Sequence, residues 1–390
     1  MTDTAHRLHA CPDDAARFEA DIPALCIQNH AANLMPLANG DIGCVWFGGT
    51  QEGIADISIY FSRLSRDAAA WSPPVKLSDD PTRSEQNPIL FPAPDGKLWL
   101  LYTAQKSGNQ NTAIVRYRIS DDNGASWGPI DTLFEKAGTF VRQPVVMLDN
   151  GDWLIPVFYC RTEPGDKWVG NNDISAVMIS TDQGKSWREH EVPESVGCVH
   201  MNIEKMPGGA LLALFRSRWA DHIYSSRSLD NGRSWSVPTP TELPNNNSSI
   251  QFTRLANDHL AIVFNDISSA QATERRLSLY DEIEDDEDTP GTPQAAPAPH
   301  TTTGKTAFWG TPRAPMTLAI SEDGGKTWPY KRNLEIGDGY CMSNNSEKQI
   351  NREFSYPSIK QTADGFIHIA YTYWRQKIKY VRVSEDWVKG

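Results

Sequence analysis

The chain has 390 residues, 39% of them hydrophobic, and a formal net charge of −12. This length supports a sizeable core in one large domain or two ordinary ones, and the charge argues against nucleic acid or an anionic membrane as a partner, because the average field repels a polyanion. The six cysteines have no CxxC pair and no metal-like spacing, so reduced thiols are expected, with no disulfide framework and no zinc site.

The N-terminal stretch MTDTAHRLHACPDDAARFEAD is acidic and lacks the basic start and apolar run of a secretion signal. The chain also has no apolar run of about 18 residues, the length that a spanning helix needs. We therefore expect a cytoplasmic protein, or a periplasmic or secreted one if a signal has been removed.

Six segments in chain order each contain a strand, a turn with Asp-Gly, Asn-Gly or a relative, and a second strand. They cover residues 33–49, 87–104, 143–160, 202–218, 250–266 and 356–374. Tight turns between alternating apolar runs predict β-hairpins. A third strand is predicted after each hairpin, at residues 57–63, 113–120, 174–180, 223–228, 316–321 and 378–384.

Four third strands run directly into the pattern Ser-x-Asp-x-Gly-x-Ser/Thr-Trp, which begins at Ser120, Ser180, Ser228 and Ser321. Ser and Asp side chains can bond nearby backbone N–H groups, Gly takes a positive φ, and Trp packs the turn onto a sheet. These residues are therefore predicted to hold turns and not to perform chemistry.

Six such units about 50 residues apart, each completed by an outer strand, predict an all-β protein of four-stranded blades, a β-propeller. We expect one domain over residues 1–390. The last unit ends at Trp387 without room for a fourth strand, so residues 6–10 or 17–22 are predicted to close the ring. A degraded seventh blade is left open around residues 267–313, where the acidic, Pro-rich stretch 283–305 predicts a mobile surface loop.

The first strand of every unit begins with polar residues, although the first strand of a propeller blade lines the central axis. Unpaired polar groups gathered in one concavity cost stability unless a ligand or water satisfies them. The candidate binding or catalytic residues at these strand starts are Gln28, Asn29, His30, Gln86, Asn87, Arg142, Gln143, His200, Asn202, Asn247, Glu353 and Tyr356.

The loops after the second strands open on the same face and add further candidates. These are Gln51, Glu52, Arg161, Trp168, Arg216, Arg218, Trp219 and Arg375. Converging arginines bind a carboxylate, sulfate or phosphate through paired N–H donors, and Trp rings stack on sugars, although each Arg could instead stabilise its own loop. The combination favours a saccharide that carries a uronic or sialic acid, with neither nucleic acid nor membrane as a partner.

The four repeated boxes are the Asp-box (BNR) motif, and residues 20–390 resemble the sialidase-like β-propeller superfamily. The resemblance implies the fold and a glycan-directed function. In exo-sialidases a Tyr nucleophile pairs with a Glu, and Tyr356 with Glu353 resembles that pair. The Phe/Tyr-Arg-Ile-Pro motif that carries the first sialidase arginine is absent, and His30 stands in its place.

The segments QNHAAN, VWFGGTQEG, SEQNP, VRQP, CVHMN, NNNSS and FSYPS are similar to a neighbouring branch of α-L-rhamnosidases acting on rhamnose–glucuronic acid and of rhamnose–uronate lyases such as those for ulvan. This resemblance implies His30, His200, Tyr356 and Arg218 as catalytic residues, with no required cofactor and no metal ligands. A divalent cation in the central channel is left open. The alternatives are an exo-α-sialidase and a non-catalytic glycan-binding propeller.

Overall fold

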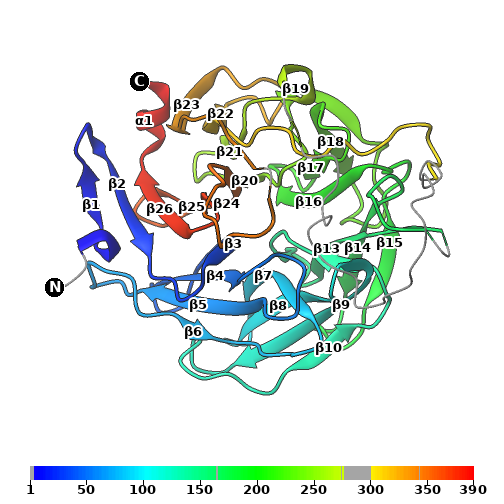
Figure 1. Ribbon diagram of the computed structural model, residues 1–390, viewed down its shortest axis with the longest axis horizontal. Helices are drawn as coiled ribbons and strands as arrows, with labels where there is room; N and C mark the ends of the chain where they lie inside the picture. The colour runs from blue at the N-terminus through cyan, green and yellow to red at the C-terminus, as the bar shows by residue number, and fades with distance from the viewer. Residues whose placement is uncertain (1–3, 164–165, 274, 276–299, 342) are drawn as a thin grey trace.

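The computed structural model describes residues 4–163, 166–273, 275, 300–341 and 343–390. Six antiparallel sheets surround a common centre like the blades of a propeller (Figure 1). This confirms the predicted six-bladed β-propeller. Within the described residues, the segment from residue 267 to residue 313 contains only the 3-10 helix η2 (Ser269–Gln271) and no strand, so no seventh blade is found there.

The first three blades follow the predicted hairpins. Blade one contains β3 (Gln28–Pro36), β4 (Ile42–Gly49), β5 (Ser58–Leu64) and β6 (Val75–Lys76). Blade two contains β7 (Ser84–Pro92), β8 (Leu98–Lys106), β9 (Asn109–Ser120) and β10 (Asp131–Phe134). Blade three contains β11 (Thr139–Val141), β12 (Val146–Met147), β13 (Trp153–Tyr159), β14 (Ile174–Ser180) and β15 (Arg188–Glu191). The hairpin glycines Gly40, Gly96 and Gly151 all have φ of 86°, the conformation that favours glycine.

The next two blades repeat the pattern. Blade four contains β16 (Cys198–Lys205), β17 (Leu211–Ser217), β18 (His222–Ser228) and β19 (Thr239–Pro244). Blade five contains β20 (Gln251–Arg254), β21 (Leu260–Asn265), β22 (Met316–Ser321) and β23 (Tyr330–Glu335). The loop predicted over 283–305 interrupts blade five between β21 and β22, and most of it lies outside the described residues.

The last blade joins the two ends of the chain. It contains β24 (Phe354–Gln361), β25 (Ile367–Tyr373), β26 (Lys377–Val383), β2 (Asp14–Ile22) and β1 (His9–Cys11). Strand β2 pairs antiparallel with β26, with Ile22 opposite Ile378, so N-terminal residues close the ring as predicted. The short 3-10 helix η1 (Thr4–His6) lies beside β2 of this blade, whereas α1 (Glu385–Lys389) lies against β22 and β23 of blade five (Figure 1).

Apolar side chains fill the space between neighbouring blades. The Trp127 ring of the first Asp box lies 6.1 Å from Phe61 of blade one, and Trp187 of the second lies 5.7 Å from Phe134 of blade two. Each of these Trp rings therefore fixes its turn to the preceding blade.

In the part of the chain that the structure describes, no helix has the length and apolar character needed to cross a membrane.

Candidate functional site

Four inner strands carry an irregularity at the same place, close to their first residues. The register shifts between His30 and Asn33, Gln86 and Ile89, Val199 and Asn202, and Ser355 and Ser358. Each shift contains a residue with a left-handed backbone: Ala31, Asn87, His200 and Tyr356, with φ of 61°, 52°, 53° and 51°. Bulges of this kind re-aim a side chain, and a left-handed conformation costs of order 1–3 kcal/mol for residues other than glycine. The repeated strain turns Asn87, His200 and Tyr356 toward one another.

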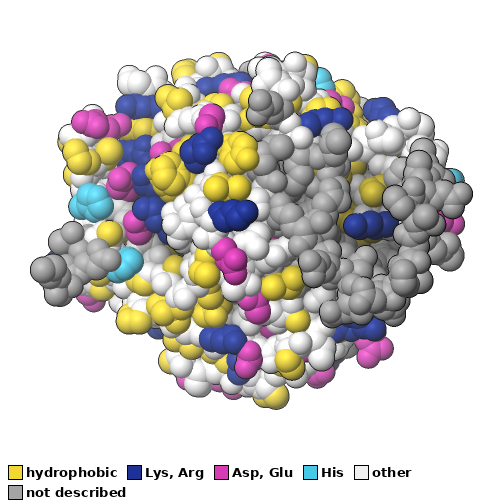
Figure 2. Space-filling model, in the orientation of Figure 1, with side chains coloured by type: hydrophobic (Ala, Val, Ile, Leu, Met, Phe, Trp, Pro, Cys, Tyr) yellow, Lys and Arg dark blue, Asp and Glu magenta, His cyan; other side chains and the backbone are white. Residues whose placement is uncertain are grey.

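These three side chains line a small cavity on the propeller axis, which we call the central hollow. Its lining is Glu52, Gln86, Asn87, Gln110, Phe140, Phe158, His200, Arg216, Arg218, Trp309, Arg313 and Tyr356. Its free volume is about 20 Å³, roughly the space of one water molecule. On the face seen in Figure 2, the described Lys and Arg side chains alternate with Asp and Glu and form no continuous basic patch.

Tyr356 lies at the centre of this site. Its hydroxyl accepts a hydrogen bond of 2.7 Å from Nη1 of Arg216, and its ring centre lies 4.3 Å from that of His30 and 5.7 Å from that of His200. Nη1 of Arg216 is also 3.4 Å from Nε2 of His200. A guanidinium only donates, so Nε2 of His200 accepts and its proton resides on Nδ1. The geometry thus couples a phenol to an arginine and two imidazoles.

Both histidines are fully enclosed and neutral at pH 7. Burial lowers the pKa of His30 well below 6.5, and the Arg375 charge lowers it further. Burial and then the Arg216 charge likewise lower the pKa of His200. Within the described residues, Nε2 of His30 and Nδ1 of His200 have no hydrogen-bond partner. Buried ring nitrogens of this kind are costly to keep without a partner, which marks both residues as candidates for binding or proton transfer.

A second set of charges surrounds Glu353. Its carboxylate receives Nε of Arg375 at 3.0 Å and Nη1 of Arg313 at 3.2 Å, and the Ser355 hydroxyl at 2.8 Å. Arg375 also reaches Glu52 at 2.6 Å. Burial alone would raise the pKa of Glu353, but Arg375 and Arg313 hold it well below its usual range. Tyr356 and Glu353, the predicted nucleophile pair, therefore bind different partners in this structure.

The arginines of the hollow differ in whether a carboxylate neutralises their charge. Arg218 donates to Oδ2 of Asp173 from Nε at 2.9 Å and from Nη2 at 2.7 Å. Arg216 instead donates Nε to the Asn247 amide oxygen at 2.8 Å, and no ion pair joins it to a carboxylate within the described residues. Burial lowers the pKa of Arg216 to about 10. It stays charged at pH 7, so an anion in the hollow would be stabilised most by Arg216.

Arg142 occupies the axis below the site. Its guanidinium donates to the carbonyl oxygens of Ala32, Tyr356 and Pro357 at 3.1 to 3.2 Å. Carbonyl oxygens of this kind would bind a channel cation, and here a guanidinium binds them. Arg142 was predicted to contact the substrate. In the structure its side chain instead supports the backbone at Tyr356.

One group of described residues brings His, Asp, Glu or Cys ligand atoms close enough to share a metal ion: His259, Glu322 and Glu385. It does not belong to the central hollow. The Lys389 ammonium lies 2.7 Å from Glu385 and 2.5 Å from Glu322, so a resident cation already neutralises these carboxylates.

Several predicted site residues bind the protein itself. The amides of Asn29, Gln143 and Asn202 bond backbone groups of Gln376, Ile250 and Phe252, and Gln28 bonds the Ser346 hydroxyl. Gln51 accepts from Asn345 at 3.4 Å.

Three further predicted residues lie outside the hollow. Arg161 is exposed and 3.4 Å from Glu191, and Trp219 packs on Gly197. Trp168 is buried behind the hollow, where it donates to Asp173 and lies 5.4 Å from Arg218.

Three important residues were missed by the sequence reasoning: Asp173, Arg313 and Trp309. Asp173 and Asp221 stand immediately before β14 and β18, and Asp56 stands two residues before β5. An acidic residue at the start of a third strand was therefore a repeated signal in the sequence. Arg313 and Trp309 lie in the interrupted fifth unit, which has no repeat against which to compare them.

The chain belongs to the family of the BNR repeat-like domain, whose model matches residues 40–369. No curated protein matches it. The structure is similar to the Hadza microbial sialidase Hz136, with 13% identity, 95% of this chain and 69% of that chain covered, and a TM-score of 0.71. It is also similar to the intramolecular trans-sialidase of Ruminococcus gnavus (13% identity, 93% and 95% covered, TM-score 0.65) and to a protein of unknown function from Dyadobacter fermentans (15% identity, 94% and 98% covered, TM-score 0.65). At these identities the likeness establishes the sialidase-like fold.

Proposed function

We propose that the protein is a glycosidase-type enzyme that cleaves a glycan beside an anionic sugar, with rhamnose–glucuronic acid as the linkage. The observation that carries this proposal is the Tyr356 hydroxyl, held 2.7 Å from Arg216 between two neutral histidines. An uncompensated arginine supplies the charge that a uronate carboxylate needs. The phenol and the imidazoles supply groups that can exchange protons with it.

Arg216, in place of the predicted Arg218, is proposed to bind the carboxylate. Asp173 already neutralises Arg218 through two bonds to one oxygen, so a second carboxylate there would be repelled. Arg218 is proposed to position the site through Phe158 and Trp309, whose ring centres lie 5.8 and 5.0 Å from its guanidinium carbon.

Two reactions fit this arrangement. In an elimination, Arg216 neutralises the uronate, one neutral histidine takes the C5 proton, and Tyr356 protonates the leaving oxygen. In a hydrolysis, the Tyr356 hydroxyl protonates the glycosidic oxygen, and one neutral histidine takes a proton from a water molecule that attacks the anomeric carbon of the rhamnose, while the carboxylate remains bound to Arg216. The two reactions differ in product: elimination gives an unsaturated uronate and hydrolysis gives free rhamnose.

Exo-α-sialidase activity is the second candidate. It is favoured by the convergence of Arg216, Arg218 and Arg313 on one hollow within a sialidase-like fold. A Tyr356 nucleophile would need Glu353 as its base, and Glu353 is bound by two arginines. The sialidase reaction therefore requires Glu353 to exchange partners during catalysis.

The central hollow must widen to admit a sugar. The segment around Trp309 covers it: Trp309 donates to the Val169 carbonyl at 2.9 Å, and the Phe308 N–H donates to the Arg218 carbonyl at 2.8 Å. We propose that displacement of Trp309 opens the hollow during substrate binding.

The test is a product assay on a rhamnosyl-glucuronate oligosaccharide, an ulvan oligosaccharide and a sialoside, read by ultraviolet absorbance of unsaturated uronate and by detection of free rhamnose and free sialic acid. We expect one of the two uronate substrates to be cleaved, with turnover reduced about 10²- to 10⁴-fold in Tyr356→Phe. Tyr117→Phe is the matched control, because Tyr117 lies on the outer part of blade two. Binding of all three glycans without any product would identify a lectin and overturn the proposal.

A further inference from the structure

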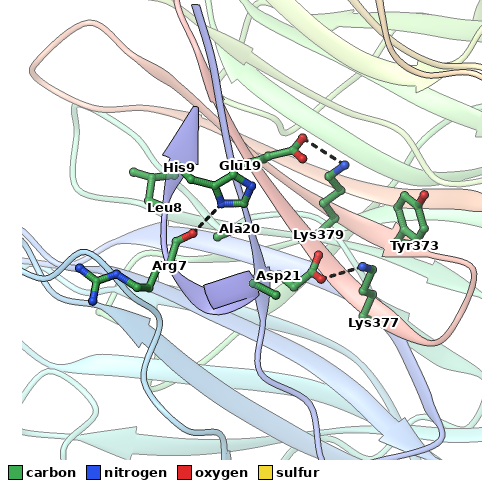
Figure 3. A pocket seen from close by; sticks show the side chains of 10 residues that line it. Arg7, Leu8, His9, Glu19, Ala20, Asp21, Tyr373, Lys377 and Lys379 are labelled. Atoms are coloured by element: carbon green, nitrogen blue, oxygen red, sulfur yellow. Dashed lines mark hydrogen bonds and ion pairs between the residues drawn. The ribbon is translucent and has the colours of Figure 1, made fainter. Parts of the chain in front are cut away.

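A second hollow lies at the outer edge of blade six, which we call the edge hollow. Its walls come from η1 and the start of β1, from β2, and from the β25–β26 hairpin (Figure 3). Its volume is about 530 Å³, within the range of small-molecule sites, which begins at about 300 Å³. It is lined by Ala5, Arg7, Leu8, His9, Glu19, Ala20, Asp21, Tyr373, Lys377 and Lys379.

Ion pairs hold the polar side chains of this hollow in place. Lys377 lies 2.6 Å from Asp21, and Lys379 lies 3.1 Å from Glu19. The two ammonium groups are 4.9 and 5.3 Å from the centre of the Tyr373 ring. The wall therefore offers an aromatic ring flanked by fixed donors and acceptors, the combination that binds a hydroxylated ring.

Arg7 gives the edge hollow its net charge. Its side chain is exposed, and no hydrogen bond or ion pair to its guanidinium occurs within the described residues. The hollow thus contains one cation more than its two carboxylates neutralise. This excess favours a ligand with a single negative charge over a neutral sugar.

The β25–β26 turn connects the two hollows. Tyr373 and Lys377 face each other across this turn, and Arg375 between them reaches into the central site to Glu353 and Glu52. Tyr373 and Arg375 are two residues apart, so their Cα atoms lie at most about 7 Å from each other. This turn is therefore a direct covalent link between the residues of the two hollows.

We propose that the edge hollow is an accessory subsite for further anionic sugars of the same oligosaccharide, with Tyr373 stacking on one ring and Arg7, on the opposite side of the hollow, binding the carboxylate of a neighbouring sugar. The proposal rests on the proposed function for the class of sugar. The central hollow selects the linkage that reacts, and the edge hollow selects substrates with a further uronate.

Binding to an ulvan oligosaccharide, measured by titration calorimetry, tests the edge hollow. We expect Arg7→Ala to weaken binding about fivefold, the effect of losing one exposed charge pair, and Tyr373→Ala to weaken it at least as much. Lys185→Ala is the matched control, because it removes an exposed positive charge at an Asp-box turn and should leave affinity unchanged.

Equal affinity of Arg7→Ala, Tyr373→Ala and wild type would overturn the accessory subsite. Arg7 is exposed, so its variant folds even if Tyr373→Ala disturbs the neighbouring Phe354 ring, 5.1 Å away. If no glycan is cleaved but Arg7→Ala still weakens binding, the proposed reaction fails and the subsite stands. If a glycan is cleaved but its affinity is insensitive to Arg7, the reaction stands and the subsite fails.

Discussion

The Asp-box turns and the starts of the inner strands are both repeated polar segments. They differ in how far apart in the sequence their hydrogen-bonded residues lie. In the box at Ser228, the Gly232 N–H donates to the Ser228 hydroxyl at 2.9 Å and the Ser234 N–H to Asp230 at 2.9 Å. The repeated Ser, Asp, Gly and Trp positions of this box bond one another within four residues. At the strand starts, His30 meets Thr372 at 2.8 Å across 342 residues of sequence.

This contrast separates the residues that build the fold from those that carry function. The box satisfies its polar groups locally, so it forms wherever the eight-residue pattern occurs. The strand starts gather charges from all parts of the chain and leave ring nitrogens of His30 and His200 without partners among the described residues. Buried polar groups without a hydrogen-bond partner therefore indicate the site better than the repeated polar residues of the boxes do.

The largest effect is expected for Glu353→Gln. The change leaves Arg313 and part of Arg375 without a negative charge, and an uncompensated buried charge costs about 3–5 kcal/mol. Urea unfolding should detect this loss in the free energy of unfolding. Glu135→Gln, at an exposed position, should change the free energy of unfolding little. Equal losses in the two variants would mean that the buried ion pairs of Glu353 do not stabilise the fold.

Arg216→Lys tests the uncompensated arginine. An ammonium cannot bond Asn247 and Tyr356 in the geometry of the guanidinium fork, and a charged hydrogen bond is worth about 1.5–3 kcal/mol. We expect kcat/KM on the cleaved glycan to fall roughly 10- to 100-fold. Arg188→Lys, on the exposed outer strand of blade three, is the control, and full activity of Arg216→Lys would remove Arg216 from carboxylate binding.

His200→Gln tests the neutral imidazole through pH. The folded protein holds the pKa of His200 well below 6.5, so the unfolded chain binds the proton first. Stability from this source is complete above pH 6.5 and is lost as pH falls below it. The variant should show a flatter fall in unfolding free energy below pH 6.5, measured by urea titration at several pH values. An unchanged slope would contradict the burial of a neutral His200.

The smallest effect is expected for Asp230→Ala in an Asp box. The variant lacks the two hydrogen bonds of Ser234 to the Asp230 carboxylate, at 2.9 and 2.6 Å. Their loss should lower the free energy of unfolding by about 1 kcal/mol and leave turnover unchanged. Loss of turnover in a fully folded variant would show that the boxes also serve the site, and the comparison between the two regions would fail.

The sequence was sufficient to predict six blades because each unit has its own turns and alternating strands. It also identified His30, His200, Tyr356, Arg216 and Glu353, which the fold brings together. It could not separate Arg216 from Arg218, because the difference lies in Asp173, 45 residues from Arg218. Nor could it place Arg313 and Trp309, which lie in a stretch without strand pattern.

The pairing of β2 with β26 has a consequence for the order of assembly. Strand β2 is among the first parts of the chain to be synthesised and β26 is among the last, so β26 has an open edge until the two meet. Open edges invite pairing with other chains. The same meeting brings His30 to Thr372 and Arg375 to Glu52. Closure of the ring thus protects the sheet edge and completes the site together.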